Sequence, residues 1–345
     1  MLLRTLTSLL SSGARVDTGD GFWLPPQAST YSQGIDWVFY FIYWICVFFF
    51  VLIVALMILF VWKYRRTSVT HQAGETVTHH TPLELTWTII PLILVIAIFW
   101  IGLDGYVDMI RPPANAYEVN VVAQRWNWSF EHRNGAQDSQ ILKVPAGRPV
   151  KLVMTSQDVL HALFIPAFRA KQDVVPGRYT TLWFEAKEPG LYQLFCAEYC
   201  GTQHSQMGAT VAVYPPDEFD EIIAKDARWL DNYTDENLYQ AGLRIFARCS
   251  SCHSLQEEVR LTGPSFWDVH DDFGKKRLME GDYEADIDEN YIQDSILNPQ
   301  KDIVATYQGV MPTFQGALKP REVRAMVEFL KRLDEVVDRQ GNPIE

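Results

Sequence analysis

Two cysteines, a histidine and a methionine lie within one twelve-residue segment of this 345-residue sequence. The segment reads Cys196-Ala-Glu-Tyr-Cys200-Gly-Thr-Gln-His204-Ser-Gln-Met207. Thiolate and thioether sulfurs favour copper(I), imidazole suits either oxidation state, and a weak methionine is the usual axial ligand in electron-transfer copper sites. The residue types and their spacing therefore predict a copper site whose chemistry is electron transfer.

The alternative for Cys196 and Cys200 is a disulfide, which an oxidising compartment would favour. A disulfide gives no reason for His204 and Met207 to follow at these intervals, so we favour copper. Two thiolates exceed what a mononuclear blue-copper site uses, and bridging sulfurs predict a dinuclear site. A second imidazole is then needed, and His161 is the best candidate because it lies among strand-like residues.

A second cluster of ligand residue types is Cys249-Ser-Ser-Cys252-His253. Cys-x-x-Cys-His is the attachment pattern of c-type haem, in which two thioether bonds hold the porphyrin and the adjacent imidazole becomes the proximal iron ligand. A thioredoxin-like pair would need a βαβ context, and a zinc site would need further cysteines. We therefore predict one covalent haem at Cys249, Cys252 and His253.

The sixth ligand of the haem iron should lie downstream, where three methionines are available. Met326 falls on the apolar stripe of a predicted helix that begins at Pro320, so it is expected in the core. Met279 sits among charged residues. Met311 is followed by Pro312, which stiffens the loop, and Met311 is the predicted ligand.

Two stretches of the chain are apolar enough to span a membrane. Residues 37–62 and 85–103 carry no formal charge, and about 20 such residues cross a bilayer. Lys63, Arg65 and Arg66 follow the first stretch, so the positive-inside rule predicts a cytoplasmic loop and places both termini on the other side. An early arginine and several leucines in residues 1–15 leave a cleaved signal peptide as an alternative.

Charge is distributed unevenly along the chain. Residues 217–345 contain 27 acidic and 15 basic residues, whereas residues 112–216 contain 8 and 9. The break falls at Pro215-Pro216, which predicts a domain junction with an extended linker. The acidity of the last domain predicts that it attracts basic partners, at rates that fall as salt screens the charges.

Between the second apolar stretch and this junction the pattern is typical of β-structure. Short runs rich in valine, tyrosine, phenylalanine and threonine alternate with Pro-Gly and Pro-Ala-Gly breakers. The predicted strands are residues 117–122, 150–154, 179–184, 191–195 and 209–214. Such strands predict a sandwich or a Greek-key barrel.

The copper motif, Cys-x-Glu-x-Cys-x-x-x-His-x-x-Met preceded by a histidine after Asp-Val-Leu, resembles the CuA domain of cytochrome c oxidase subunit II, and the resemblance extends back through both apolar stretches. It implies that the two cysteines bridge two coppers, that each histidine binds one, and that Met207 and the backbone carbonyl of Glu198 are weak ligands. The implied copper ligands are His161, Cys196, Glu198, Cys200, His204 and Met207. The Glu198 side chain would bind a magnesium ion shared with subunit I, since carboxylate suits a hard cation.

Two further residues match the family by position. Trp126, in Gln-Arg-Trp126-Asn-Trp-Ser-Phe, resembles the residue at which electrons enter the copper site, although paired tryptophans in a strand can simply pack. Glu84 aligns with a glutamate at the mouth of a proton-uptake path. Its alternative role is to cap the cytoplasmic end of the second membrane helix.

The last third of the chain resembles small bacterial cytochromes c. The matching features are a helix over residues 235–248 before the haem motif, Gly263-Pro264 behind the proximal histidine, a Met-Pro loop and a final helix. In that family Pro264 would contact His253, and methionine–histidine ligation raises the reduction potential.

The expected fold is multidomain: an extracytoplasmic N-terminal segment (residues 1–34), a two-helix transmembrane hairpin (35–111), a Greek-key, cupredoxin-like β-barrel with CuA (112–216), and a linker with an all-α, class I-like cytochrome c domain (217–345). The resemblance implies subunit II of a respiratory haem-copper oxidase of the caa3 type in a bacterial plasma membrane. Electrons from a cytochrome c-type donor would pass from haem c to CuA and then to haem a in subunit I, for oxygen reduction coupled to proton translocation; subunit III is a further expected partner.

Two other functions fit the same residues. One is the electron-input subunit of a CuA-type nitric oxide reductase, which would differ in its large catalytic subunit. The other is a membrane-anchored electron carrier without an oxidase partner.

Overall fold

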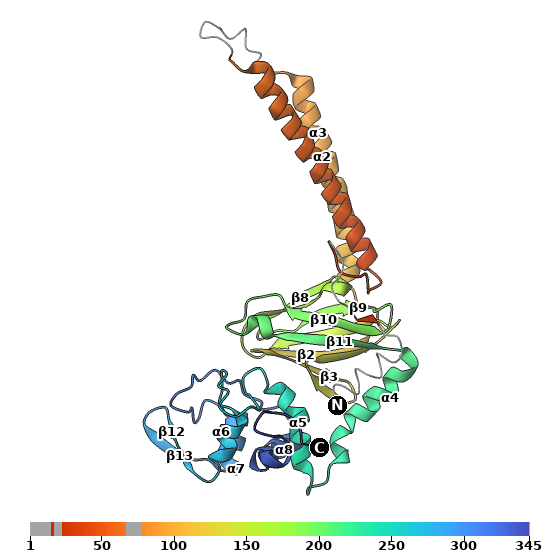
Figure 1. Cartoon of the computed structure of the whole chain (residues 1–345). Helices are drawn as coiled ribbons and strands as arrows, with labels where there is room; N and C mark the ends of the chain where they lie inside the picture. The colour runs from red at the N-terminus through yellow and green to blue at the C-terminus, as the bar shows by residue number, and fades with distance from the viewer. Residues whose placement is uncertain (1–14, 17–22, 67–77, 345) are drawn as a thin grey trace.

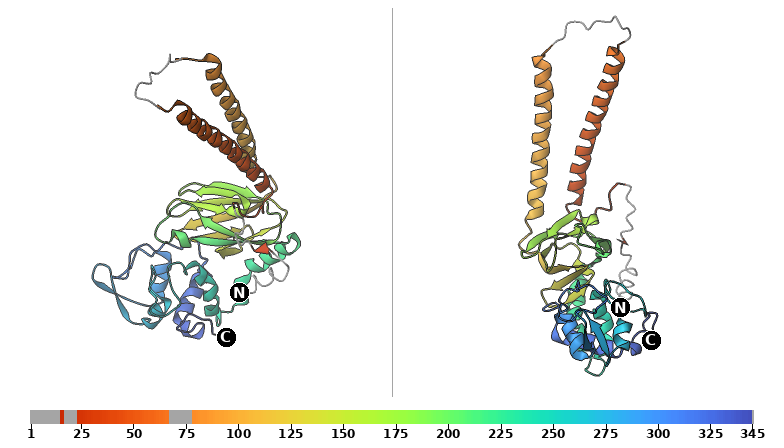
Figure 2. Two further views of the ribbon diagram at one scale, coloured as in Figure 1. Left: turned by 45° about the horizontal axis from the view of Figure 1, so that its top comes forward. Right: turned by 90° about the vertical axis from the view of Figure 1, so that its left-hand side faces the viewer.

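The structure is a computed structural model that describes residues 15–16, 23–66 and 78–344. Two long helices project from one end of a β domain, and a C-terminal domain lies at the opposite end (Figure 1). Both views in Figure 2 place the C-terminal domain directly against the β domain. The predicted order of hairpin, β domain and helical domain is therefore confirmed.

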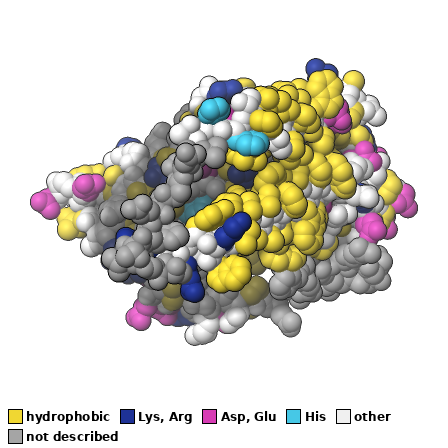
Figure 3. All heavy atoms as spheres, turned by 90° about the horizontal axis from the view of Figure 1, so that it is seen from above, with side chains coloured by type: hydrophobic (Ala, Val, Ile, Leu, Met, Phe, Trp, Pro, Cys, Tyr) yellow, Lys and Arg dark blue, Asp and Glu magenta, His cyan; other side chains and the backbone are white. Residues whose placement is uncertain are grey.

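The two long helices are α2 (Ser32–Tyr64) and α3 (Thr81–Ile110). Helices of 33 and 30 residues are about 50 and 45 Å long, more than the ~30 Å hydrocarbon core of a bilayer. Their apolar side chains point outward, and hydrophobic groups cover much of the described surface seen down the hairpin (Figure 3). Length and composition both fit membrane spans, as predicted; the loop residues 67–77 and the possible signal peptide in residues 1–14 lie outside the described part.

Both helices are fixed to the β domain at their ends near it. Arg169 Nε donates to Asp36 Oδ1 of α2 at 2.7 Å, and both side chains are buried. Trp183 Nε1 donates to the Asp108 carbonyl of α3 at 3.0 Å. The hairpin therefore has a defined attachment to the domain that carries the copper motif.

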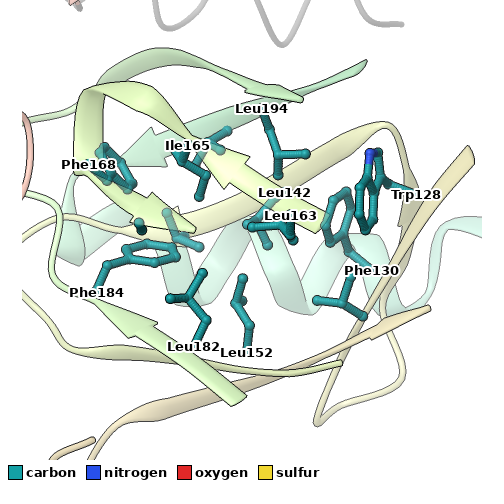
Figure 4. Close-up of a cluster of buried hydrophobic side chains, with 14 of the residues drawn as sticks. Trp128, Phe130, Leu142, Leu152, Leu163, Ile165, Phe168, Leu182, Phe184 and Leu194 are labelled. Carbon is teal, nitrogen blue, oxygen red and sulfur yellow. The ribbon is translucent and has the colours of Figure 1, made fainter. Parts of the chain in front are cut away.

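The β domain is built from two sheets packed face to face around a buried core (Figure 4). One sheet has the order β5-β11-β10-β7-β8, with the short β1 (Arg15–Val16) beside β10, and the other has the order β4-β3-β2-β6-β9. The core contains Trp128, Phe130, Leu163 and Phe168, among others. The strands are β2 (Tyr117–Gln124), β3 (Asn127–His132), β4 (Gln137–Ser139), β5 (Ile141–Pro145), β6 (Val150–Ser156), β7 (His161–Ile165), β8 (Ala170–Val174), β9 (Thr180–Phe184), β10 (Gly190–Cys196) and β11 (Gly208–Tyr214).

All five predicted strands are present, as β2, β6, β9, β10 and β11. The pattern missed β4 and β8, whose sequences Gln-Asp-Ser and Ala-Lys-Gln-Asp-Val are too polar or too short for an alternating apolar signal. It also missed β3, β5 and β7 as separate strands. Both sheets contain parallel as well as antiparallel pairs: β2 is parallel to β6 in one sheet, and β5 is parallel to β11 in the other.

The predicted extended linker after the β domain is largely helical. Pro215 is extended (φ −53°, ψ 139°), but α4 (Pro216–Ala227) begins at the next residue, since proline is well accepted in the first turn of a helix. Phe219 and Ile223 of α4 pack against Tyr214 of the β domain. The first part of the linker, α4, is therefore packed against the β domain and leaves it in one fixed orientation.

The C-terminal domain contains α5 (Gly242–Ile245), α6 (Phe266–Asp271), α7 (Glu289–Leu297) and α8 (Pro320–Lys331), with a small hairpin of β12 (Lys276–Met279) and β13 (Tyr283–Asp286). The final helix predicted from Pro320 is confirmed as α8. Of the helix predicted over residues 235–248, residues 238–248 are helical, although only α5 is an α-helix, and residues 235–237 are not helical. Residues 234–237 form a turn in which Asn237 Oδ1 accepts the Thr234 N–H at 2.6 Å, and this competes with a helix. Two 3₁₀ turns, Leu238–Ala241 and Phe246–Arg248, flank α5 instead.

Candidate functional site

The sulfur-rich segment connects two neighbouring strands, and we call residues 196–207 the ligand loop. β10 and β11 pair antiparallel, with Phe195 opposite Gly208. Cys196 therefore ends one strand beside Met207, which directly precedes the other, and the Cys196 N–H donates to the Met207 carbonyl at 3.1 Å. The loop folds back on its own ends, as the sequence predicted.

Two thiols, two imidazoles and a thioether converge at this loop. The Sγ atoms of Cys196 and Cys200 lie 3.9 Å apart. His161 Nδ1 is 3.8 Å from Cys196 Sγ, and His204 Nδ1 is 3.5 Å from Cys200 Sγ. Met207 Sδ lies 3.7 Å from Cys200 Sγ. The structure thus brings together the five predicted side-chain ligands of the copper site.

The sixth predicted ligand, the Glu198 carbonyl, lies at the same cluster. Glu198 O is 3.2 Å from Cys196 Sγ, while the residue itself is exposed. Tyr199 and Phe195 beside it are exposed too, at 75% and 41%. The loop therefore presents the Glu198 carbonyl to the sulfurs and an acidic and aromatic surface to the outside.

The spacing of the donors fits a metal and excludes a disulfide in this structure. The Sγ–Sγ separation of 3.9 Å is nearly twice the ~2.05 Å length of a disulfide bond. Two metal–sulfur bonds of about 2.3 Å span at most about 4.6 Å, so one ion can contact both sulfurs and a second can do so from the other side. Thiol, imidazole and thioether donors are also the set that suits copper.

The pKa values of the two thiols depend on burial and on the groups around each of them. Burial opposes ionisation of Cys196, but the interaction with His161 and hydrogen bonds with the Ala162 and Glu198 backbone together outweigh it and lower the pKa of Cys196 to about 6. Burial and the neighbouring Cys196 raise the pKa of Cys200. Because a coordinated cation deprotonates its thiol ligands, a bound metal would allow both sulfurs to be thiolates.

Trp126 lies against the ligand loop and is only 4% exposed. A Cβ atom on Gly201 would lie 3.1 Å from Trp126 Cζ2, and Gly201 has a φ of +127°, so glycine is required there for two reasons. Trp128, from the same strand segment, donates its indole N–H to the Met207 carbonyl at 3.3 Å. The two tryptophans thus pack on the loop as well as on the core.

The C-terminal domain contains a largely apolar cavity of about 1060 Å³, including its open mouth. All three residues of the predicted haem attachment motif line it, as does Met311. The apolar walls and the two free thiols that line the cavity fit a covalently bound haem.

The imidazole of His253 is held with one nitrogen occupied. His253 Nδ1 lies 2.8 Å from the Pro264 carbonyl, which confirms the predicted contact between these residues. That bond leaves Nε2 available, the usual arrangement for a metal-binding histidine. Gly263 packs on the ring so closely that a Cβ atom would come within 2.5 Å of Cε1. Burial lowers the pKa of His253 and so favours the neutral ring that binds iron.

The three candidate methionines occupy different positions. Met279 and Met326 are fully buried, and Met326 also lines the cavity from α8. Met311 is half-buried on the loop before Pro312 and borders both the cavity and the cleft next to it. Met279 is thus a core residue of β12 despite its charged neighbours in sequence.

The two candidate sites face each other across the domain boundary. A small cleft is lined by Gln124 and Arg125 from the β domain and by Cys252 and His253 from the C-terminal domain. Cys252 packs against the hydrophobic cluster that includes Trp126. The C-terminal domain therefore covers the β domain on the side of Trp126.

Glu84 lies in the first turn of α3. Its Oε1 accepts the His80 N–H at 2.9 Å, and His80 Nδ1 accepts the Leu83 N–H at 3.2 Å. This reciprocal arrangement satisfies donors at the start of the helix in the manner of a capping box. The capping role of Glu84 is thus present in the isolated chain.

Sequence reasoning missed several polar residues around the two sites. Asp158 Oδ1 bonds His161 Nε2 at 2.8 Å, and its Oδ2 accepts the Arg125 N–H at 2.7 Å. The spacing of three residues between Asp158 and His161 was the available signal. Gln203 and Thr262, which hydrogen bond across the domain boundary at 2.7 Å, offered none because their proximity depends on the tertiary fold.

Comparison with known proteins matches each part of the chain to a family. Residues 18–103 match the transmembrane domain of cytochrome c oxidase subunit II, residues 131–213 its periplasmic domain, and residues 239–334 cytochrome c. The cytochrome c oxidase subunit 2 of Alkalihalophilus pseudofirmus is 30% identical over 293 residues, which cover 82% of each chain. That of Synechocystis is 27% identical, covering 59% of this chain and 76% of the relative.

One solved structure with similarity is the periplasmic domain of subunit II of cytochrome oxidase from Bradyrhizobium japonicum. It is 24% identical, with 34% of this chain and 99% of that chain covered and a TM-score of 0.33. The matched transmembrane, periplasmic and cytochrome c regions follow one another along the sequence in the order of the hairpin, the β domain and the C-terminal domain. The chain belongs to the cytochrome c oxidase subunit II family, and it carries a cytochrome c domain at its C-terminal end.

Proposed function

We propose that this chain receives electrons for a respiratory haem-copper oxidase at its own haem c, passes them to a dinuclear CuA centre, and delivers them to haem a in subunit I, where oxygen is reduced to water with proton translocation. The observation that carries the proposal is the contact between the two sites. The haem attachment residues Cys252 and His253 share one cleft with Gln124 and Arg125, which directly precede Trp126.

Copper and a covalent haem supply reversible one-electron chemistry when bound. Cys196 and Cys200 would bridge the two coppers, with His161 and His204 each binding one through Nδ1, the nitrogen that faces the sulfurs. Met207 and the Glu198 carbonyl would complete the two ion sites. Because the loop is closed by strand pairing and by the hydrogen bond between Cys196 and Met207, these ligands need little rearrangement on changing charge.

Cys249 and Cys252 would form the thioether bonds to haem c, and His253 and Met311 would bind its iron. Burial raises the pKa of Cys249 to about 12 and also raises the pKa of Cys252. Both thiols are therefore neutral, unlike the low-pKa thiolate of a disulfide oxidoreductase. This supports attachment of haem rather than thiol redox chemistry.

The position of Trp126 determines where a soluble donor binds. Trp126 is buried beneath the C-terminal domain, so a diffusing protein cannot reach it. The donor, a cytochrome c-type protein, would bind the acidic C-terminal domain, and Trp126 would receive electrons from within the chain. Reduction of haem c by a basic donor should then slow with rising ionic strength.

The exposed end of the ligand loop would face subunit I. Tyr199 and Phe195 are large apolar groups exposed beside Glu198, and such groups are typical of a surface covered in a complex. The Glu198 carboxylate would bind the shared magnesium ion. Both redox domains would lie on the extracytoplasmic side of the bacterial membrane, with Lys63, Arg65 and Arg66 on the cytoplasmic side.

The proposal is tested by metal and haem analysis of the purified chain with its optical and EPR spectra. We expect two coppers with an EPR signal delocalised over both ions, and one covalent haem per chain. Cys196→Ser and His204→Ala should lose copper but keep haem, whereas Cys249→Ala combined with Cys252→Ala should lose haem but keep copper. Unchanged copper content in the first pair would contradict the ligand set.

A further inference from the structure

One side-chain hydrogen bond joins the ligand loop to the C-terminal domain within the described residues. Gln203 Nε2 donates to Thr262 Oγ1 at 2.7 Å. Both side chains are half-buried at the domain boundary. The donor lies in the β domain and the acceptor in the cytochrome c domain, so the bond crosses from one cofactor site to the other.

Each partner in this bond is directly next to a cofactor-binding segment. Gln203 precedes His204, whose Nδ1 faces the copper sulfurs. Thr262 lines the haem cavity and precedes Gly263, which packs on the ring of His253. The Gly263 N–H also donates to the Cys252 carbonyl at 2.8 Å. A short path of covalent bonds and two hydrogen bonds, Gly263 to Cys252 and Gln203 to Thr262, thus leads from the haem attachment segment to His204.

The other domain contacts do not offer this connection. Arg248 bonds Gln137 at 3.2 Å and Lys319 bonds the Gly135 carbonyl at 3.2 Å, and both acceptors lie at the β3–β4 hairpin, away from the ligand loop. Trp126 touches the loop at Gly201, but its Nε1 is buried without a hydrogen-bond partner in the described structure. The two hydrogen bonds from Arg248 and Lys319 thus hold the domains together without bonding to the loop, and the contact between Trp126 and Gly201 lies within the β domain.

We propose that Gln203 and Thr262 are positioning residues that fix the electron path from haem c to CuA. The inference rests on the proposed function, because it assumes that electrons pass between these two centres. One electron moves: the haem iron goes from ferrous to ferric, the oxidised copper pair is reduced by one electron, and no bond is made or broken. The hydrogen bond sets the distance and alignment of the loop for that transfer.

The test uses the complete oxidase and starts with Thr262→Val, which removes the acceptor, keeps the side-chain shape, and leaves the copper domain untouched. Thr262→Ser restores the acceptor, and Gln203→Leu removes the donor from the other side. Thr306→Val is the matched control, since Thr306 is an exposed threonine of the same domain.

Two measurements compare these variants. Haem c is reduced photochemically, and the change of copper absorbance with time then gives the rate of internal electron transfer. The relaxation effect of ferric haem on the copper EPR signal reports the separation and orientation of the sites independently of turnover.

We expect a several-fold slower transfer in Thr262→Val and Gln203→Leu, with haem and copper content unchanged in Thr262→Val. Thr262→Ser and Thr306→Val should transfer at the original rate. An altered relaxation effect in Thr262→Val would support a positioning role, whereas slower transfer with an unaltered relaxation effect would contradict it, because the separation and orientation of the sites would then be unchanged. An original rate in Thr262→Val would overturn the inference while leaving the proposed function intact. Absence of transfer in the unmodified protein would instead refute the proposed function.

Discussion

Asp158 Oδ1 lies 2.8 Å from His161 Nε2, so the carboxylate holds the imidazole with its other nitrogen, Nδ1, toward Cys196. The same carboxylate accepts the Arg125 N–H, which ties the histidine to the strand end that carries Trp126. A carboxylate behind a metal-binding histidine fixes the tautomer and the orientation of the ring.

Asp158→Ala should therefore weaken copper binding by about 10- to 100-fold, the usual effect of losing such a partner. Asp158→Asn keeps an acceptor of the same shape and should lose less. Competition with a copper chelator measures both. Equal copper retention in Asp158→Ala and the unmodified protein would show that Asp158 does not orient His161.

Met311 is predicted to be the second axial ligand of the haem iron. Met311→Leu should abolish the weak near-infrared absorption of methionine-bound ferric haem and lower the reduction potential, because methionine–histidine ligation raises it. Met326→Leu and Met279→Leu are matched controls from the same domain, and both should keep the band and the potential. The band disappearing in Met326→Leu but not in Met311→Leu would reassign the ligand to α8.

Lys143 is buried between two carboxylates from different segments. Its Nζ lies 2.8 Å from Asp138 and 2.5 Å from Asp226 at the end of α4. Lys143→Met removes the ammonium group and leaves Arg244, 3.5 Å from Asp138 and 3.3 Å from Asp226, as their cation, so it should lower the free energy of unfolding by about 3 kcal/mol, the lower end of the range for a broken buried pair. Lys225→Met removes an exposed pair with Glu221 and should cost far less, because solvent screens the attraction between exposed charges. Denaturant unfolding of the detergent-solubilised chain compares the two, and equal losses would contradict the prediction.

His132 should make the stability of the β domain depend on pH. It is buried beside Tyr117, and burial, with the positive charge of Lys143, lowers the pKa of His132 to about 4. Between pH 6.5 and 4 the unfolded chain binds a proton that the folded chain does not, so stability is complete above pH 6.5 and falls as pH drops toward 4. The total loss is about 3 kcal/mol. In His132→Gln, the free energy of unfolding should depend less steeply on pH over this interval. The same pH dependence in the variant and the unmodified protein would refute the assignment.

Glu84 can be tested for proton uptake separately from its capping role. Glu84→Gln retains a carbonyl oxygen that can accept the His80 N–H, so the start of α3 should be preserved. If Glu84 takes up protons, proton translocation by the complete oxidase should fall while the amounts of copper, haem and assembled complex stay the same. Unaltered proton translocation would leave helix capping as the role of Glu84.

The sequence was most informative where chemistry and local spacing coincide. The copper and haem motifs could be recognised because their ligands, apart from His161 and Met311, lie within a few positions of one another. Cys196 and Met207 could be paired because one ends a strand and the other directly precedes the next strand. The two membrane helices were equally clear, since a charge-free run of sufficient length needs no tertiary information.

What depends on contacts between distant segments could not be predicted. The burial of Trp126 and the bond between Gln203 and Thr262 arise only when the C-terminal domain packs on the β domain. The turn at Asn237 delayed the start of the helix expected from residue 235 because a side chain competed for a backbone donor. The charge break at Pro215-Pro216 indicated a junction, but it did not reveal that α4 packs back on the β domain through Phe219.

The central claim is that haem c in this chain is the source of electrons for copper in the same chain. Its most direct test is rapid reduction of the purified oxidase by a basic donor cytochrome, with haem c and copper absorbance followed together. We predict that haem c is reduced first, that copper is reduced as haem c is reoxidised, and that a chain lacking Cys249 and Cys252 shows almost no copper reduction. Copper reduction at the original rate in that haem-free chain would contradict the account.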